Sequence, residues 1–343
     1  MGKELEVKLL NAASLQQQVD VYIRAFETKD TAQKIIEYWK KKHFDNPIHP
    51  SYVFGVYDEE RLVSINAYMP MHYVYNHKLC NVIQSCESGT IPEYRGKGIW
   101  SKVVRFAVDY FVNEGKYDFL IGFPNFDNSY GGFMKMKWNH DADVINFILI
   151  ANGKEFVRHI LNKTVASVGY ALGIQKTVVV CRENKEYKVV KQLHSLDCVE
   201  NGFYLKADFD FLLWKEKYKG LNSFCIADSN NSIIATCMYY LGEYKGAEVI
   251  HFCNPIIGKD CKSVEKVYAF AIKTVLKNNP GAAFVRAWAI KDSDAERIYK
   301  KIMFLRSKHH NPFITYQLKD DVVSADVLHA AKNWENISFL DLD

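Results

Sequence analysis

The sequence predicts an α/β protein in which one fold, a mixed sheet flanked by helices, occurs twice. Three observations lead to this prediction. Strand and helix patterns alternate over residues 52–150, a loop with two glycines joins a strand to a helix near residue 96, and the order of elements recurs in the second half. A length of 343 residues is typical of about two domains, at ~150 residues per domain.

Three strands are expected first. Apolar residues alternate over Tyr52–Tyr57 and Leu62–Met69, and the acidic turn Asp58–Glu60 between them predicts a hairpin. A third strand is expected over Lys78–Glu87. The stretch Ser88–Gly98 combines glycine with charge, as at the end of a strand that continues into a loop.

A helix and a central strand come next. In Ser101–Glu114 the apolar residues share one helical face, and Gly115 is placed to end the helix. Asp118–Phe123 is a short apolar run, as expected at the centre of a sheet. A second helix over about 127–138 and a strand over Asp143–Ile150 complete the unit. Because a helix connects the third strand to the fourth, we expect these two strands to be parallel.

The second half repeats this order in weaker form. A hairpin is expected around 225–235, a helix with one apolar face over Ser263–Lys277, and a central strand over Ala283–Trp288. The aromatic and basic segment Trp39–Phe44 recurs as Trp214–Lys219. The strand around Val82 and Ile83 recurs at Val249–His251, and Phe133–Trp138 recurs as Tyr299–Phe304. These six echoes in the same order predict a tandem duplication.

The repeat sets the expected domain boundaries. Residues 1–152 form the first domain, 153–192 a connector, and 193–343 a degenerate second copy. An amphipathic stretch from Phe156 to Leu172 predicts a bridging helix within the connector.

Composition narrows the class of protein. The chain has 44 lysine and arginine residues against 40 acidic residues, a net charge of +4, which argues against a nucleic-acid binder. No apolar run approaches ~18 residues, so no membrane span is predicted. Met1–Asn11 lacks the basic and apolar regions of a signal peptide, and we therefore expect a cytoplasmic protein. The eight cysteines form no Cys-x-x-Cys pair, which favours buried reduced thiols and no metal site.

One loop has a composition suited to binding a ligand. It consists of Thr90, Ile91, Pro92, Glu93, Tyr94, Arg95, Gly96, Lys97, Gly98, Ile99 and Trp100. The glycines let the backbone approach a ligand, and the first N–H groups of the following helix lack intrahelical partners. Together with the positive end of the helix dipole they predict an anion site suited to a pyrophosphate. The pattern is neither a Walker loop nor Gly-x-Gly-x-x-Gly, because Ser101 occupies the position of the third glycine.

A family resemblance rests on this loop. Arg95-Gly96-Lys97-Gly98-Ile99, preceded by Pro92-Glu93-Tyr94, resembles the acetyl-CoA pyrophosphate loop [R/Q]-x-x-G-x-[G/A] of the GNAT N-acetyltransferases. The strand order is similar to that fold as well. The resemblance implies tandem GNAT-like domains, each a mixed, mostly antiparallel sheet with a parallel, splayed central pair flanked by helices. It covers about residues 1–150 through the motif and 195–320 through the repeat alone.

Two further segments, Trp39–Pro47 and Trp334–Asp343, are similar to those of GNAT-like proteins linked to bacterial cell-surface polysaccharide synthesis. This resemblance implies a primary amine on a small molecule as acceptor, with a nucleotide-linked amino sugar as the first choice.

The resemblance also implies which residues bind acetyl-CoA. These are Thr90, Ile91, Arg95, Gly96, Lys97, Gly98, Ile99, Trp100 and Asn125. Backbone N–H groups near Ile91 are expected to hydrogen-bond the thioester carbonyl. Asn125 either bonds pantetheine or serves as a cap or turn residue.

Acetyl transfer requires a deprotonated amine and a stabilised leaving thiolate. Glu87, on the strand that leads to the loop, either deprotonates the amine through water or faces solvent. His43 and His72 lie where this fold shapes the acceptor site, although single histidines are more often structural. The run Lys40–Lys42 is expected to be a solvated helix face.

The chain departs from the family pattern at two positions. Trp100 stands where the family has Gly or Ala, and it either crowds the pyrophosphate or forms a wall along the cofactor. Phe133 stands where many members have a tyrosine that protonates the thiolate. Tyr130, the nearest phenol, is the candidate for this general acid, although its register differs by three residues. The second half has Tyr299 at that position but Asn254–Lys259 in place of the loop. We therefore expect CoA to bind in the first half only.

Three functions are compatible with these features. The leading prediction is an acetyl-CoA-dependent N-acetyltransferase. The alternatives are a Fem-type aminoacyl or other acyl transferase and a non-catalytic CoA-binding scaffold, the latter because Trp100 and Phe133 break two family positions. The near-neutral charge argues against an aminoacyl-tRNA donor.

Overall fold

The computed structural model describes residues 5–156, 158, 186–192, 196 and 202–338. The expected helix over 156–172 lies almost wholly outside these residues. The chain forms two compact units, of which unit 1 comprises residues 1–141 and 312–330, and unit 2 comprises 142–311 and 331–343. The two repeated halves and the two compact units therefore divide the chain differently.

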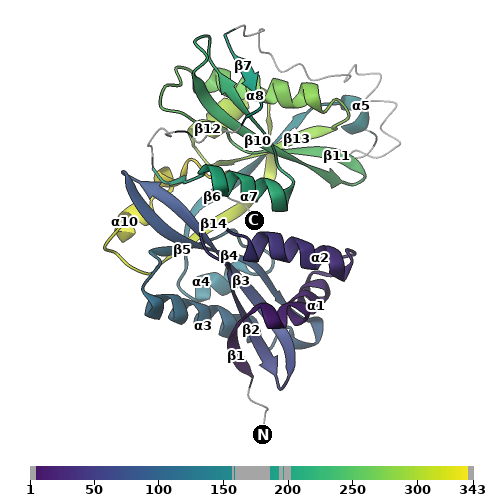
Figure 1. Cartoon of the computed structure of the whole chain (residues 1–343), viewed down its shortest axis with the longest axis vertical. Helices are drawn as coiled ribbons and strands as arrows, with labels where there is room; N and C mark the ends of the chain where they lie inside the picture. The colour runs from purple at the N-terminus through teal and green to yellow at the C-terminus, as the bar shows by residue number, and fades with distance from the viewer. Residues whose placement is uncertain (1–4, 157, 159–185, 193–195, 197–201, 339–343) are drawn as a thin grey trace. The chain divides into compact units, whose positions relative to one another are not determined.

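Six neighbouring strands of the sheet form the centre of unit 1, and the last of them, β14, belongs to this unit only from residue 312 onward (Figure 1). In spatial order its strands are β1 (Glu6–Leu10), β2 (Tyr52–Asp58), β3 (Arg61–Tyr75), β4 (Lys78–Thr90), β5 (Phe119–Gly122) and β14 (Leu305–Gln317). The predicted hairpin is confirmed, because Asp58 pairs with Arg61 across a two-residue turn. The parallel pairing of β4 with β5 is also confirmed.

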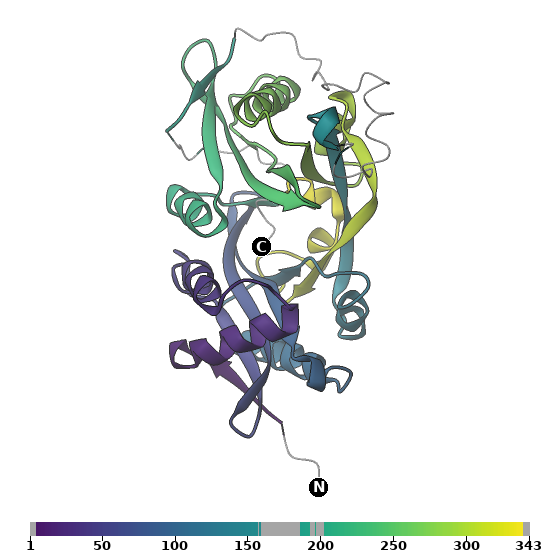
Figure 2. The same cartoon turned by 90° about the vertical axis from the view of Figure 1, so that its right-hand side faces the viewer.

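Helices cover both faces of this sheet. They are α1 (Leu15–Phe26), α2 (Ala32–Trp39), α3 (Ile99–Glu114), α4 (Tyr130–Lys135) and α10 (Ala325–Leu328), with a π-helical turn η2 (Lys40–Phe44) directly after α2. Figure 1 shows α1 and α2 on one side of β2–β4 and α3 on the other, and Figure 2 shows the purple α1 lying across these strands. Phe111 of α3 is fully buried against Phe54 and Tyr68.

Strand β4 contains a bulge close to its carboxyl end. Ser85 pairs with Tyr68 and Ser88 pairs with Asn66, so Cys86 and Glu87 face the single residue Ala67. A bulge interrupts the ladder and redirects side chains locally. In β4 it lies immediately before the glycine-bearing loop.

Unit 2 repeats the architecture. In spatial order its strands are β6 (Asn139–Ile150), β13 (Phe284–Ile290), β11 (Ala247–Phe252), β10 (Ile233–Tyr244), β9 (Asn222–Ala227) and β7 (Lys188–Val190), with β12 (Ile256–Ile257) paired to β10. Its principal helices are α7 (Phe209–Lys219), α8 (Val264–Asn278) and α9 (Asp294–Lys301). As in unit 1, a helix connects two parallel strands, here β11 and β13. Aliphatic and aromatic side chains of these strands and of α8 form one buried core.

The last strand of each half belongs to the other half's sheet. β6 follows α4 in the chain, yet its residues Val144–Ile150 pair with β13 in unit 2. β14 follows α9, yet its residues Ile314–Gln317 pair with β5 in unit 1. This exchange is the reason that the compact units are discontinuous in sequence.

Among the described residues, no helix is both long and apolar enough to cross a membrane.

Candidate active site

The sheet opens where the parallel strands β4 and β5 stop pairing. They pair only from Val82 with Phe119 to Ser85 with Gly122, and β4 then continues for five residues to Thr90 while β5 ends. The carboxyl ends of parallel strands are where open α/β sheets bind ligands. The C-terminal part of β4, the loop after it and the first turn of α3 therefore form the candidate site.

The loop presents backbone to this opening as the sequence predicts. Gly96 and Gly98 have φ values of 75° and 71°, a region that favours glycine, and a Cβ atom at either position would meet nothing within 4 Å. Gly98 is the N-cap of α3. The open space above both glycines and the positive end of a 16-residue helix fit an anionic group such as a pyrophosphate.

Side chains of the loop hold it in place. Arg95 donates from Nη2 to the carbonyl of Ala25 at 2.8 Å and from Nε to that of Thr90 at 3.1 Å. Its guanidinium therefore ties the loop to the end of α1, in addition to the expected role in binding phosphate. Lys97 is exposed, with its ammonium 4.8 Å from the centre of the Tyr94 ring.

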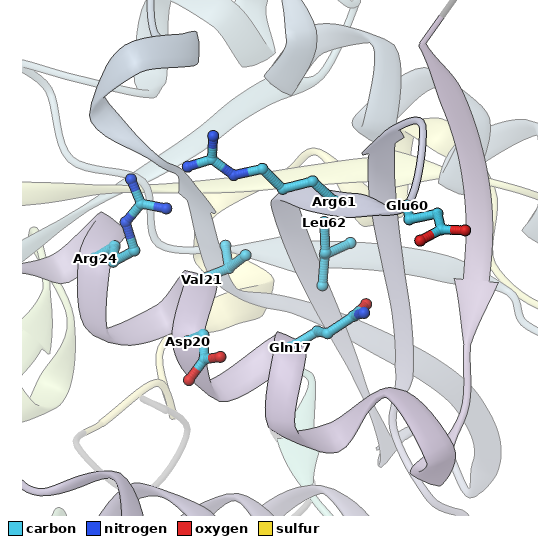
Figure 3. Close-up of a pocket in the computed structure, with 7 residues that line it drawn as sticks. All are labelled: Gln17, Asp20, Val21, Arg24, Glu60, Arg61 and Leu62. Carbon is cyan, nitrogen blue, oxygen red and sulfur yellow. The ribbon is translucent and has the colours of Figure 1, made fainter.

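A surface pocket of about 280 Å³ lies beside the loop, between α1 and the β2–β3 turn (Figure 3). Arg24 and Arg61 line it and both pair with Glu93 of the loop, Arg61 at 3.5 Å. Asp20 and Glu60 also line it, so its charges largely cancel. These contacts brace the loop rather than form a second anion site.

Ile91 is a correction to the sequence-based prediction. Its side chain is fully buried, and its N–H donates to the carbonyl of Val63 at 3.0 Å. This N–H is thus not available to a thioester carbonyl. The neighbouring Thr90 Oγ1 lies 2.8 Å from Ser64 Oγ, which anchors the end of β4.

Glu87 is buried and does not face solvent. Its carboxylate forms an ion pair with Lys42 of η2 and accepts a hydrogen bond from the Tyr38 hydroxyl at 3.1 Å. His43 Nε2 lies 3.3 Å from the second carboxylate oxygen. The side chains of Lys42 and His43 are fully buried, and that of Glu87 is 8% exposed. Lys42 therefore contradicts the prediction of a solvated face, whereas Lys40 and Lys41 are exposed as expected.

Charge and burial shift the ionisation of this cluster. Lys42 and His43 hold the pKa of Glu87 well below its ordinary 4.5, although burial acts in the opposite direction. Burial lowers the pKa of His43 below 6.5, and its attraction to Glu87 offsets only part of that effect. At neutral pH the cluster thus contains an ionised carboxylate on Glu87 and a neutral imidazole on His43. Nε2 of His43 faces the Glu87 carboxylate, whereas Nδ1 has no hydrogen-bond partner among the described residues.

Trp100 lies on the opposite face of β4. Its indole N–H donates to the Ser88 hydroxyl, and its ring packs edge-on against Phe133 of α4, with 4.9 Å between the centroids. A Cβ atom on Gly132 would lie 2.3 Å from the indole, so only glycine leaves room for this ring. The side chains of Glu87 and Ser88 thus point to opposite faces of β4.

Comparison with known families decides the assignment. Residues 6–139 match the model of the acetyltransferase (GNAT) domain. They are a GNAT acetyltransferase domain. The match indicates an acyltransferase activity for this part of the chain, because the family generally transfers acetyl groups from acetyl-CoA. No protein with a curated description matches the sequence significantly.

Solved structures show that the GNAT fold extends over both units. A probable N-acyltransferase from Enterococcus faecalis superposes with a TM-score of 0.62 at 12% identity, covering 92% of this chain and 73% of that one. A tandem GNAT protein from the clavulanic acid biosynthesis pathway gives 0.57 at 10% identity, covering 93% and 100%. A region described as a glucosamine N-acetyltransferase in a fungal β-N-acetylglucosaminidase gives 0.54 at 12%, covering 92% and 38%. The tandem GNAT fold that the sequence predicts is therefore confirmed.

The GNAT domain brings some of the predicted residues together and separates others. His43 lies beside Glu87. His72, on β3, pairs with Asn81 of β4, and Asn81 precedes Glu87 by six residues along that strand. At about 3.3 Å per residue, that is ~20 Å away. His72 is thus not next to Glu87, contrary to the expectation that both histidines line one site.

The residues after β5 occupy a turn. The Asn125 side chain accepts the N–H of Asp127 at 2.9 Å, and its carbonyl accepts the N–H groups of residues 128–130. The structure thus gives Asn125 the turn role, one of the two roles expected for it. The Tyr130 hydroxyl lies 2.9 Å from His140 Nδ1, and its ring packs against Phe126.

In the second GNAT-like unit, the residues at the corresponding positions have structural contacts. Tyr299 is fully buried and donates its hydroxyl proton to Asn254 Oδ1, and burial raises its pKa well above the ordinary value. Asn254 in turn donates to the carbonyl of Ile337 at 3.3 Å. Both polar groups are engaged in the core of unit 2, in keeping with an intact loop in the first half alone.

Sequence reasoning missed Lys42, Tyr38 and Ser88 as members of the site. A signal for Lys42 exists, since Ile35, Trp39 and Lys42 follow the i, i+4, i+7 spacing of one helical face and all three are buried. The neighbouring exposed lysines conceal this periodicity. Ser88 has no signal of its own, because its role depends on the position of Trp100.

Proposed function

We propose that the protein is an acetyl-CoA-dependent N-acetyltransferase whose acceptor is a primary amine on a small molecule, and that the acceptor is an amino sugar. The observation that carries the cofactor assignment is the pair Gly96 and Gly98, whose open left-handed backbone precedes the N-terminus of α3. The family resemblance of two flanking segments, and a structural relative described as a glucosamine N-acetyltransferase region, support the amino sugar.

The loop residues would hold the pyrophosphate of acetyl-CoA. The oxygen atoms of the pyrophosphate would accept hydrogen bonds from the backbone N–H groups of Gly96, Lys97 and Gly98 and from those of the first turn of α3. The side chain of Lys97 would supply positive charge. Pantetheine would then run along β4 toward the bulge at Cys86 and Glu87. There, one backbone N–H freed from the ladder would replace Ile91 as the donor to the thioester carbonyl.

The buried cluster would act on the amine. An ionised Glu87 attracts the ammonium form of the acceptor, and the same carboxylate orients the neutral imidazole of His43 as a proton acceptor. We propose that the two residues work as one unit, in which Lys42 keeps Glu87 charged. The low pKa of Glu87 makes it a weak base when acting alone.

The cofactor assignment is tested by thermal unfolding with and without acetyl-CoA. Acetyl-CoA should raise the Tm of the unaltered protein, and Gly98→Glu should abolish the increase by placing a carboxylate in the anion site. Gly115→Glu is the matched control, since Gly115 also has a left-handed backbone (φ 61°) with open space but lies at the opposite end of α3. If neither acetyl-CoA nor CoA stabilises the unaltered protein, the proposal is wrong.

The acceptor is tested by release of free thiol from acetyl-CoA with glucosamine, nucleotide-linked amino sugars, polyamines and amino acids. Glu87→Gln should lower the turnover number without changing the Tm increase caused by acetyl-CoA. A protein that binds CoA but releases thiol with none of these amines would instead be a CoA-binding scaffold.

A further inference from the structure

We propose that the Ser88 hydroxyl, oriented by the indole N–H of Trp100, donates the hydrogen bond that stabilises the departing thiolate. This inference rests on the proposed function and concerns the step in which the carbon–sulfur bond breaks. In that step the amine nitrogen bonds the acetyl carbon, and the electron pair of the broken bond remains on sulfur. The amine's proton goes to the imidazole of His43 and then to solvent, so the products are the amide, the thiolate and one proton.

The location of the two residues supports this role. Ser88 lies on β4 three residues beyond Ser85, the last residue that pairs with β5. It is therefore in the stretch where the parallel strands have separated. Trp100 is the second residue of α3, and its ring spans from Ser88 to Gly132 and Phe133 on α4. Both side chains lie on the α3 side of β4, opposite to the Glu87 cluster and next to the end of the sheet at which β4 and β5 separate.

The hydrogen bond between them leaves one donor unused. Because the indole nitrogen can only donate, the Ser88 oxygen must be the acceptor. The hydroxyl proton of Ser88 has no acceptor among the described residues, so it can be donated to a ligand in the opening. A hydroxyl that already accepts a hydrogen bond is polarised and becomes a stronger donor.

The side chains around Ser88 and Trp100 offer few other hydrogen-bond donors for the thiolate. Phe133 has no polar atom, and the Tyr130 hydroxyl lies against His140. Trp138 packs on the other side of Phe133, with 4.8 Å between ring centroids, and its buried N–H has no hydrogen-bond partner among the described residues. Trp138 therefore serves as the matched control, because it permits the same loss of an indole N–H within the same aromatic cluster.

The test measures the pKa of the CoA thiol bound to the full-length protein. The absorbance of the thiolate is followed by pH titration of the complex with CoA, and the complex with desulfo-CoA, which lacks the sulfur, is the blank. A hydrogen bond to an anion favours the ionised form. Ser88→Ala should thus raise the pKa of the bound thiol by about one unit, a tenfold change in the ionisation constant.

The other variants separate the roles. Trp100→Phe should raise the thiol pKa by a smaller amount, because Ser88 remains but is no longer oriented. Ser88→Thr, which retains a hydroxyl, should restore the low value, and Trp138→Phe should leave it unchanged. The affinity for CoA and the Tm of each variant show that the site is still folded.

Three outcomes would overturn different parts of the proposal. If the unaltered protein binds CoA but Ser88→Ala and Trp100→Phe leave the thiol pKa unchanged, the role of Ser88 is refuted and the proposed function stands. A rise in thiol pKa on Trp138→Phe alone would assign the donor to Trp138 instead. If CoA does not bind the unaltered protein at all, the proposed function fails and this inference fails with it.

Discussion

Lys42 and Glu87 form an ion pair that is almost entirely removed from solvent. Removal of one partner from such a pair leaves an uncompensated buried charge, which destabilises proteins by about 3–5 kcal/mol. Lys42→Met should therefore lower the free energy of unfolding by about 3 kcal/mol in urea. Lys40→Met, two residues away and exposed, should change it by less than about 0.5 kcal/mol. Equal effects of the two variants would contradict a buried pair.

The stability of the protein should fall as the pH drops below 6.5. The folded-state pKa of His43 is below 6.5, so the unfolded chain binds a proton that the folded protein does not. The free energy of unfolding therefore decreases as the pH falls through that window. The contribution of Glu87, whose folded-state pKa is well below 4.5, is present above pH 4.5 and is lost only at lower pH.

His43→Gln isolates the histidine part of this dependence. It should flatten the slope of unfolding free energy between pH 6.5 and 4.5 as measured in urea, whereas replacement of the exposed His309 by Gln should not. An unchanged slope in His43→Gln would show that His43 is not buried in its neutral form.

Gly132 and Trp100 should be strongly coupled. Gly132→Ala places a methyl group 2.3 Å from the indole and should destabilise the protein by about 1–3 kcal/mol. The adjacent Gly131 is also helical and meets nothing within 4 Å, so Gly131→Ala should instead stabilise the protein by about 0.5–1 kcal/mol. In a Trp100→Ala background, Gly132→Ala should lose its penalty. A double-mutant cycle by thermal or urea unfolding measures this coupling, and an additive result would contradict the packing.

The hydrogen-bonded side chains of Tyr299 and Asn254 in unit 2 should contribute to the stability of the protein and not to cofactor binding. Tyr299→Phe removes the donor to Asn254 and should lower the free energy of unfolding by about 1–3 kcal/mol. The increase in Tm caused by acetyl-CoA should remain as in the unaltered protein. Loss of that increase would indicate that unit 2 takes part in binding CoA.

Much of the fold follows from local patterns that are visible in the sequence. The alternation in Leu62–Met69 and the single apolar face of Ser101–Glu114 predict β3 and α3, because burial of one face sets the period of apolar residues. The parallel pairing of β4 with β5 follows from the helix between them. The glycines of the loop predict a close approach of the backbone to a ligand, and the left-handed φ of 71° at Gly98 is a conformation that favours glycine.

The exchange of β6 and β14 could not be predicted in the same way. A strand with an apolar face has the same pattern whichever sheet it joins, so the pattern of Asp143–Ile150 does not reveal its partner. The chain order favours pairing within one half, and the structure pairs these residues with β13. Only long-range contacts distinguish the two arrangements.

The site was only partly predictable for a related reason. The anion loop is a local feature, and its residues stand together in the sequence. The Glu87 cluster unites residues separated by more than 40 positions, and it also depends on a bulge that shifts two side chains of β4. Neither the bulge nor the burial of Lys42 within a run of three lysines has a local signature.

The strand exchange has a consequence for biosynthesis. The edge of β5 receives β14, whose first residue lies 183 positions after the last residue of β5. At about 5–20 residues per second, a ribosome needs ~10–40 seconds to produce that intervening chain. During this time the growing polypeptide exposes an unpaired strand edge next to the glycine-bearing loop, and such an edge can recruit another chain. The half that carries the GNAT motif is synthesised first, yet its sheet becomes complete only after almost all of the second half has been made.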